Sequence, residues 1–171
     1  MAQHLILPGS LTAAYTATQY TNGLTPRLGD TYFDQALNKA YIFLKNDGSG
    51  SIAAKLAMRA LATDLSLFYC VVSSTTIADN ELLFAGVRVS GSTALAQDEY
   101  GWFQVKGSVT MTASSDTCTA NLGVCTSNQS AGQVEAAADS AAGVRGTFGV
   151  AETTTASGDV VVKLQYNVWG V

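Results

Sequence analysis

The sequence Tyr100-Gly-Trp-Phe-Gln-Val-Lys-Gly-Ser-Val-Thr-Met111 decides the fold class, because from Phe103 onward it alternates between apolar and polar residues. The apolar positions are Phe103, Val105, Val109 and Met111, and the polar positions are Gln104, Lys106, Ser108 and Thr110. A period of two residues is typical of a β-strand with one buried face. Trp102 is the exception, since it places a large apolar ring on the polar face. We therefore predict a half-buried strand that begins with a tryptophan on its polar side.

The last strand-like segment repeats this arrangement over residues 160–169. Its apolar face consists of Val160, Val162, Leu164, Tyr166 and Val168. Lys163, Gln165 and Asn167 form the other face, and Trp169 lies at the end of that polar face. The two segments together are predicted to define the core sheet.

The remaining strands are predicted from short apolar or alternating runs that are separated by turn residues. These runs are Arg27–Phe33, Ala40–Lys45, Leu65–Ser73, Leu82–Ser90, Ala120–Thr126, Val134–Ala137 and Val144–Ala151. The first two runs read as a hairpin, and the continuous apolar run at Leu65–Ser73 predicts a strand buried on both faces. Many short strands with regular turn signals are typical of an antiparallel sandwich or barrel. The fold class is therefore predicted as all-β, an antiparallel β-barrel or β-sandwich of many short strands over residues 24–171.

Two segments are expected to differ from the strand pattern. Residues 52–62 are rich in Ala, Leu, Lys, Met and Arg, which favours one short helix, with a strand and a loop as the alternative. Residues 1–23 have almost no charge and no helical period. We expect them to form an extended N-terminal arm that lies on this subunit or on a neighbour, or else a loosely ordered terminus.

The composition argues against nucleic acid and membranes as partners. Of the 171 residues, 47% are hydrophobic and 13% are charged, and the net charge is −4. Phosphate binding needs clustered positive charge, whereas the nine Lys and Arg residues are scattered along the chain. No export signal and no apolar run long enough to span a bilayer are visible, so we expect the chain to be made in a cytoplasm. This low content of charged residues predicts a surface that is neutral or covered by partners.

The three cysteines are expected to be thiols. Cys70 lies in an apolar run, and Cys118 and Cys125 are close together in the sequence. An odd number of cysteines without a signal peptide favours thiols, with a Cys118–Cys125 link across a hairpin as the alternative. A zinc site on these two residues is not expected, because no second pair of ligands accompanies them.

Residues for catalysis are scarce, so we do not expect an enzyme. The single histidine, His4, lies in the N-terminal arm, and no nucleophile elbow, phosphate loop or dinucleotide fingerprint is present. The close carboxylates Asp98–Glu99 and Asp79/Glu81 are read as solvated loop charges, with calcium ligands as the alternative. A glycosidase with two carboxylates that meet only in space stays open. No cofactor and no metal are expected.

The two tryptophans, Trp102 and Trp169, have two possible roles. They cover the barrel ends inside the subunit, or they lie at a subunit contact, where aromatic residues concentrate. The residues that we expect at a contact with another subunit or a capsid are Leu5, Ile6, Leu7, Tyr15, Tyr20, Trp102 and Trp169.

Two phrases of the sequence resemble a known family. Phe84-Ala-Gly-Val-Arg-Val89 and Tyr100-Gly-Trp-Phe-Gln-Val-Lys-Gly107, followed by alternating strands with Gly149-Val-Ala151, resemble the small decoration (cement) proteins of tailed bacteriophage heads. The resemblance covers about residues 27–168. The chain departs from the family at Lys55, where the family often has glycine, and this departure bears on the helix predicted at 52–62.

The resemblance implies a β-barrel or β-sandwich subunit, usually a homotrimer, at local threefold positions on the capsid exterior. The implied partner is the major capsid protein, whose shell such proteins stabilise. The implied location is the virion, with assembly in the host cytoplasm, and no catalytic residue is carried over. The alternative is a carbohydrate- or host-surface-binding β-module of a phage head or tail fibre, with Trp102 or Trp169 as a stacking platform.

Overall fold

The computed structural model describes residues 10–61, 67–72, 84–114, 117–127, 129–137 and 147–165, and it is predominantly β-structure. A single sheet joins the ten strands of these residues, and one short helix, α1 (Ala17–Thr21), precedes them. The strands are β1 (Thr31–Asp34), β2 (Lys39–Asn46), β3 (Ala57–Ala60), β4 (Tyr69–Val72), β5 (Phe84–Val87), β6 (Tyr100–Ala113), β7 (Gly123–Thr126), β8 (Val134–Ala136), β9 (Gly149–Ala151) and β10 (Gly158–Leu164). The predicted all-β class is confirmed.

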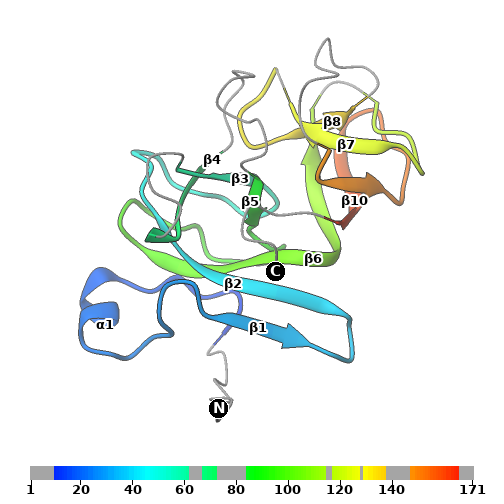
Figure 1. The fold of residues 1–171 in the computed structure, drawn as a ribbon. Coiled ribbons are helices and arrows are strands. Elements are labelled where there is room, and N and C mark those ends of the chain that lie inside the picture. The colour runs from blue at the N-terminus through cyan, green and yellow to red at the C-terminus, as the bar shows by residue number, and fades with distance from the viewer. Residues whose placement is uncertain are drawn as a thin grey trace.

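The strands close into two rings that share β6 (Figure 1). The first ring runs β2–β4–β3–β5–β6 and closes because residues 100–106 of β6 pair with β2. The second ring runs β6–β10–β9–β7–β8 and closes where Ala113 pairs with Val134. β1 belongs to neither ring and pairs with β2 alone among the described strands. The fold is therefore a closed five-stranded barrel continued by a second, shorter ring.

The strand β6 serves both rings by changing direction at Gly107. This residue has a φ of +84°, a conformation that favours glycine, and a Cβ atom there would lie 2.6 Å from the Asn38 carbonyl oxygen. Residues 100–106 pair with β2, whereas residues 107–113 pair with β10. The long strand predicted from the sequence is thus one strand with two different sets of neighbours.

Each ring has its own apolar core, and the two cores meet at β5 and β6. Phe103 and Val105 point into the first ring, whereas Val109 and Met111 point into the second. Phe84 of β5 stacks on Phe148 of the second ring with ring centroids 4.0 Å apart. The predicted alternation is therefore confirmed, but its apolar face fills two cores.

Several other strand predictions are confirmed within the described residues. β1 and β2 form the predicted hairpin, although β1 begins later than the predicted Arg27. β10 lies beside β6 over its whole length, as expected from the repeated pattern. β4 is less buried than the predicted run at 65–73, because Cys70 alone of its residues is fully buried. The predicted strand portions at 65–66, 82–83, 144–146 and 166–169 lie outside the described residues.

The helix predicted over residues 52–62 is wrong. Residues 57–60 form β3, which lies between β4 and β5 and completes the first ring. Ile52 makes an isolated β-bridge to Leu95, and Lys55 has a φ of +69°, which no helix tolerates. Burial of Ala57 and Met58 in the two cores outweighs the helix propensity of the segment. The alternative, a strand with a loop, is the one that forms.

The arm is not uniformly extended, because α1 forms within it. Thr16 accepts a hydrogen bond from the Gln19 N–H (3.3 Å), and the Gln19 side chain accepts one from the Thr16 N–H (2.8 Å). This reciprocal pair is a capping box, which starts a helix without a long apolar period. Of the arm, residues 10–23 are described, and they lie against the β-domain rather than away from it.

The described residues test the expectations about the state of the cysteines and about membrane-spanning segments. The three cysteines are buried, and no disulfide joins Cys118 to Cys125, so the covalent alternative is wrong. Burial raises the pKa of the Cys70 thiol, which keeps it protonated and unreactive. Within the described ranges, no helix is long and apolar enough to cross a membrane.

Candidate binding surfaces

An aromatic face covers the outer side of β2 and the first half of β6. It consists of Tyr41, Phe43, Tyr100 and Trp102, which point away from the first-ring core. Trp102 lies edge-on to Phe43 with centroids 5.3 Å apart, and Phe43 stacks beside Tyr100 at 6.3 Å. The Trp102 side chain is fully buried, and its indole N–H has no hydrogen-bond partner among the described residues. At Tyr100 and Trp102, the face of the strand that was predicted to be polar is therefore part of a second, outer core.

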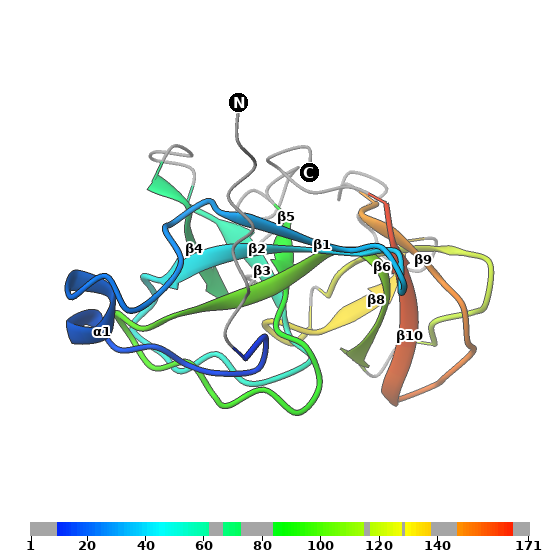
Figure 2. The same cartoon turned by 90° about the horizontal axis from the view of Figure 1, so that it is seen from below.

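The cover of this face is a segment that we name the strap, residues 10–24. Tyr15 exchanges two backbone hydrogen bonds of 2.9 Å with Tyr100, and the Tyr20 ring stacks on the Tyr100 ring at 4.3 Å. In Figure 2, β1 runs along β2, and α1 lies beside the end of β6 at the left edge of the molecule. Because aromatic pairs add to the energy of burial, the strap is held by contacts along its length.

Arg88 fixes the strap to the barrel from inside. Its side chain is fully buried, and its Nη1 donates a hydrogen bond to the Trp102 carbonyl oxygen (3.0 Å). Nη2 donates to the carbonyl oxygens of Thr12 (3.0 Å), Ala13 (2.7 Å) and Thr93 (3.1 Å). Burial lowers the pKa of Arg88 to about 10, so the guanidinium stays charged at neutral pH. Sequence reasoning missed this residue, and a single arginine in the apolar run Phe84–Val89 was the available signal.

The contact residues predicted from the sequence fall into two groups. Tyr15, Tyr20 and Trp102 meet in the aromatic face and its cover, where both tyrosines are half-buried. The Trp102 side chain is fully buried within the subunit, and the Tyr32 ring of β1 lies edge-on to it with centroids 6.5 Å apart. Leu5, Ile6, Leu7 and Trp169 lie outside the described residues. Contact of any of these residues with another protein stays a prediction.

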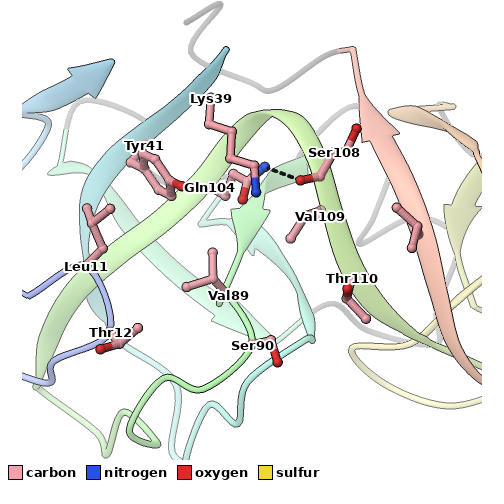
Figure 3. A pocket seen from close by; sticks show the side chains of 11 residues that line it. Leu11, Thr12, Lys39, Tyr41, Val89, Ser90, Gln104, Ser108, Val109 and Thr110 are labelled. Atoms are coloured by element: carbon pink, nitrogen blue, oxygen red, sulfur yellow. Dashed lines mark hydrogen bonds between the residues drawn. The ribbon is translucent and has the colours of Figure 1, made fainter. Parts of the chain in front are cut away.

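A groove of about 340 Å³ lies where the strap, β2 and both halves of β6 meet (Figure 3). Its lining residues are Leu11, Thr12, Lys39, Tyr41, Val89, Ser90, Gln104, Ser108, Val109, Thr110 and Val161. Gln104 Nε2 donates hydrogen bonds to the carbonyl oxygens of Lys106 (3.0 Å) and Ser108 (3.1 Å), which bracket the bend at Gly107. The groove therefore exists because β6 changes direction there.

Among the described residues, most of the large apolar side chains that are exposed lie between Leu24 and Leu37. Phe33 is 47% exposed and Leu37 is 62% exposed on the β1–β2 hairpin, and Leu24 is exposed at the end of the strap. The Lys106 ammonium lies 5.4 Å from the centre of the Phe33 ring. Since β1 has no further strand beside it in the described sheet, this hairpin is an apolar edge that a partner can cover.

The close carboxylates stabilise local structure. Asp98 and Asp47 form ion pairs with Lys45 at 2.6 Å and 3.0 Å, and Glu99 accepts a hydrogen bond from the Ala96 N–H. Burial alone would lower the pKa of Lys45, but its hydrogen bonds to the two aspartates outweigh burial and raise it. Among the described residues, no three His, Cys, Asp or Glu side chains form a group that could hold a metal ion. His4, Asp79 and Glu81 lie outside these residues.

Comparison with known proteins gives no family for the chain. No protein-family model matches it, and no curated protein matches it. Among solved structures, the chain is similar to the head fibre gp8.5 N base of bacteriophage phi29, with a TM-score of 0.47 and 8% sequence identity. The match covers 74% of this chain and 94% of that chain. At this TM-score and identity, the likeness does not establish a common fold.

Proposed function

We propose that this chain is a structural protein of a tailed-phage head, a decoration protein that binds the capsid exterior and stabilises the shell. The proposal rests on the position in the fold of the two sequence segments that resemble decoration proteins. Residues 84–89 and 100–107 form β5, Arg88 and the first half of β6, which join the two cores and anchor the strap. The resemblance therefore falls on the residues on which the architecture depends.

The surface of the chain is suited to a protein that functions by binding a partner. Only 13% of the residues are charged, and the β1–β2 hairpin presents Phe33 and Leu37 beside a strand edge that no described strand pairs with. An exposed apolar edge of this kind gains free energy when a partner buries it. We propose that this hairpin contacts the major capsid protein.

We further propose that three copies meet at each local threefold position of the capsid. Each copy then needs only a modest binding energy, because many copies act together on one closed shell. A standard interface of roughly 1,600 Å² supplies such an energy. The chain is proposed to act by binding alone, without catalysis, metal or cofactor.

The proposal is tested by sedimenting expanded, undecorated phage heads with the purified chain. We expect saturable co-sedimentation at micromolar concentration, and at least tenfold weaker binding for the double variant Phe33→Ser, Leu37→Ser. Both side chains are exposed, so the variant should fold normally. The matched control is Leu122→Ser, which changes a 43% exposed leucine beside the second ring and should bind as the parent does. Absence of binding by the parent chain would refute the proposed function.

The alternative of a sugar-stacking platform on Trp102 loses its support, because the Trp102 side chain is fully buried within the subunit. Trp169, the other platform predicted from the sequence, lies outside the described residues.

A further inference from the structure

The groove contains two buried polar side chains, each with a hydrogen-bonding atom that has no partner among the described residues. Tyr41 is 5% exposed and Gln104 is 1% exposed, and both line the groove. The two hydrogen bonds from Gln104 Nε2 fix the orientation of the amide, which leaves Oε1 as an acceptor. Neither Gln104 Oε1 nor the Tyr41 hydroxyl has a hydrogen-bond partner among the described residues, although both residues line the groove. Figure 3 shows Tyr41 and Lys39 reaching toward Gln104.

The rest of the groove combines hydroxyl groups with aliphatic walls. Ser90, Ser108 and Thr110 contribute hydroxyl-bearing side chains, and Leu11 and Val89 contribute aliphatic side chains. A ligand that fits must therefore offer several hydroxyl groups together with a face of C–H groups. A few placed polar groups within an apolar wall are what orient a small ligand in a pocket.

The charge around the groove is close to balanced. Lys39 is the one charged side chain among the lining residues, and no carboxylate lines the groove. Asp34 lies opposite Lys39 in the register of the β1–β2 hairpin, and its negative charge acts on Tyr41. Burial, then Asp34 and Tyr32, raise the pKa of Tyr41, so its hydroxyl stays a donor at neutral pH. This balance favours an uncharged, hydroxylated ligand over a strong anion.

We propose that the groove binds one neutral sugar residue of a glycan. Tyr41 Oη and Lys39 Nζ donate hydrogen bonds to the sugar oxygens, and Gln104 Oε1 accepts one from a sugar hydroxyl. The aliphatic side chains of Leu11 and Val89 contact the C–H face of the ring. The volume of about 340 Å³ lies at the lower end of ligand pockets, which suits a single sugar ring. This activity is additional to capsid binding and does not depend on it.

The strap completes the site. Leu11 and Thr12 form one wall, and Arg88 holds the Thr12 carbonyl oxygen in place. Displacement of the strap would therefore open the groove and remove that wall. Sugar binding and strap docking are expected to stabilise each other, since the ligand binds only the closed arrangement.

The test is a titration of the full chain, followed by NMR, with the methyl glycosides of glucose, galactose, mannose and N-acetylglucosamine. We expect at least one glycoside to shift the Gln104 side-chain amide and the Val89 methyl signals saturably, with a millimolar Kd. Tyr41→Phe removes only the hydroxyl and should weaken that binding about tenfold. The matched control Tyr69→Phe, on β4 outside the groove, should leave the Kd unchanged.

Three results would overturn the proposal: no glycoside gives saturable shifts, glycerol gives the same shifts as the sugars, or Tyr69→Phe weakens binding as much as Tyr41→Phe. Thermal unfolding of each variant establishes that it is folded. Should Tyr41→Phe be unstable, Ser90→Trp replaces it, because a bulky ring there blocks the groove without touching either core. Binding of Tyr41→Phe to phage heads separates the two functions, since it should equal that of the parent.

Discussion

The two rings use the same strand in different ways. In the first ring, β6 is buried on both faces over residues 100–105: the inner face lies in the barrel core, and the outer face, with Trp102, packs against the strap and β1. In the second ring, Val109 and Met111 are buried, whereas Ser108 and Thr110 on the other face are partly exposed. An alternating strand therefore predicts a buried face, but it does not tell whether another segment covers its polar face.

The features suited to binding gather at the first ring and at its junction with the second. The strap, the exposed hairpin residues Phe33 and Leu37, and the groove beside Gln104 all lie there. The second ring contributes its apolar core and one wall residue of the groove, Val161, besides β6 itself. We therefore propose that the first ring carries the recognition surfaces and that the second ring supports them.

The largest effect is expected from Trp102→Ala, which empties the centre of the aromatic face. Loss of a buried tryptophan costs about 4 kcal/mol of unfolding free energy. Phe148→Ala in the second ring should cost a similar amount, measured by denaturant unfolding. Only Trp102→Ala should also speed hydrogen exchange at the Tyr15 amide, which bonds to Tyr100. Equal exchange at Tyr15 in both variants would break the distinction between the rings.

The next effect concerns Arg88→Met, which keeps the apolar stem and removes the guanidinium. The carbonyl oxygens of Thr12, Ala13, Thr93 and Trp102 would lose the hydrogen bonds from the guanidinium, at a cost of about 2 to 3 kcal/mol. Limited proteolysis should then cleave within the strap while the second ring stays protected. A strap that resists cleavage as well as in the parent would contradict the role of Arg88.

A smaller effect is expected where β6 bends between the rings. Gly107→Ala forces alanine into a left-handed conformation and places its Cβ against the Asn38 carbonyl oxygen, which costs about 2 kcal/mol. Gly158→Ala is the matched control, because Gly158 has a similar φ (+87°) but open space around it. Its cost should be about 1 kcal/mol, from the backbone alone. If thermal unfolding showed the same loss of stability for both variants, the contact with the Asn38 carbonyl oxygen would not explain the cost at the bend.

The smallest effect is expected from Thr16→Ala, which removes the N-cap of α1. The loss should be about 1 kcal/mol and confined to the strap. Hydrogen exchange at the Tyr20 amide reports on α1, since that amide donates to the Thr16 carbonyl oxygen. Faster exchange there with unchanged exchange in β10 is the expected pattern, and a matching change in β10 would count against it.

The sequence predicted which residues form strands better than it predicted which segments pack beside those strands. The alternation at Phe103–Met111 and the turn residues are local signals, so the β class, the β1–β2 hairpin and β10 followed from them. The strand at Ala57–Ala60 did not, because its burial between two cores is set by distant segments. The capping box at Thr16 and Gln19 was readable but was missed. The groove was not predictable, since residues far apart in the sequence line it.

The most direct test of the account is cryo-electron microscopy of expanded phage heads incubated with the chain. We predict density at the local threefold positions on the outer surface, with the β1–β2 hairpin toward the shell and the second ring away from it. Undecorated heads at concentrations well above micromolar would contradict the proposed function. Density that meets the shell through the second ring alone would contradict the assignment of recognition to the first.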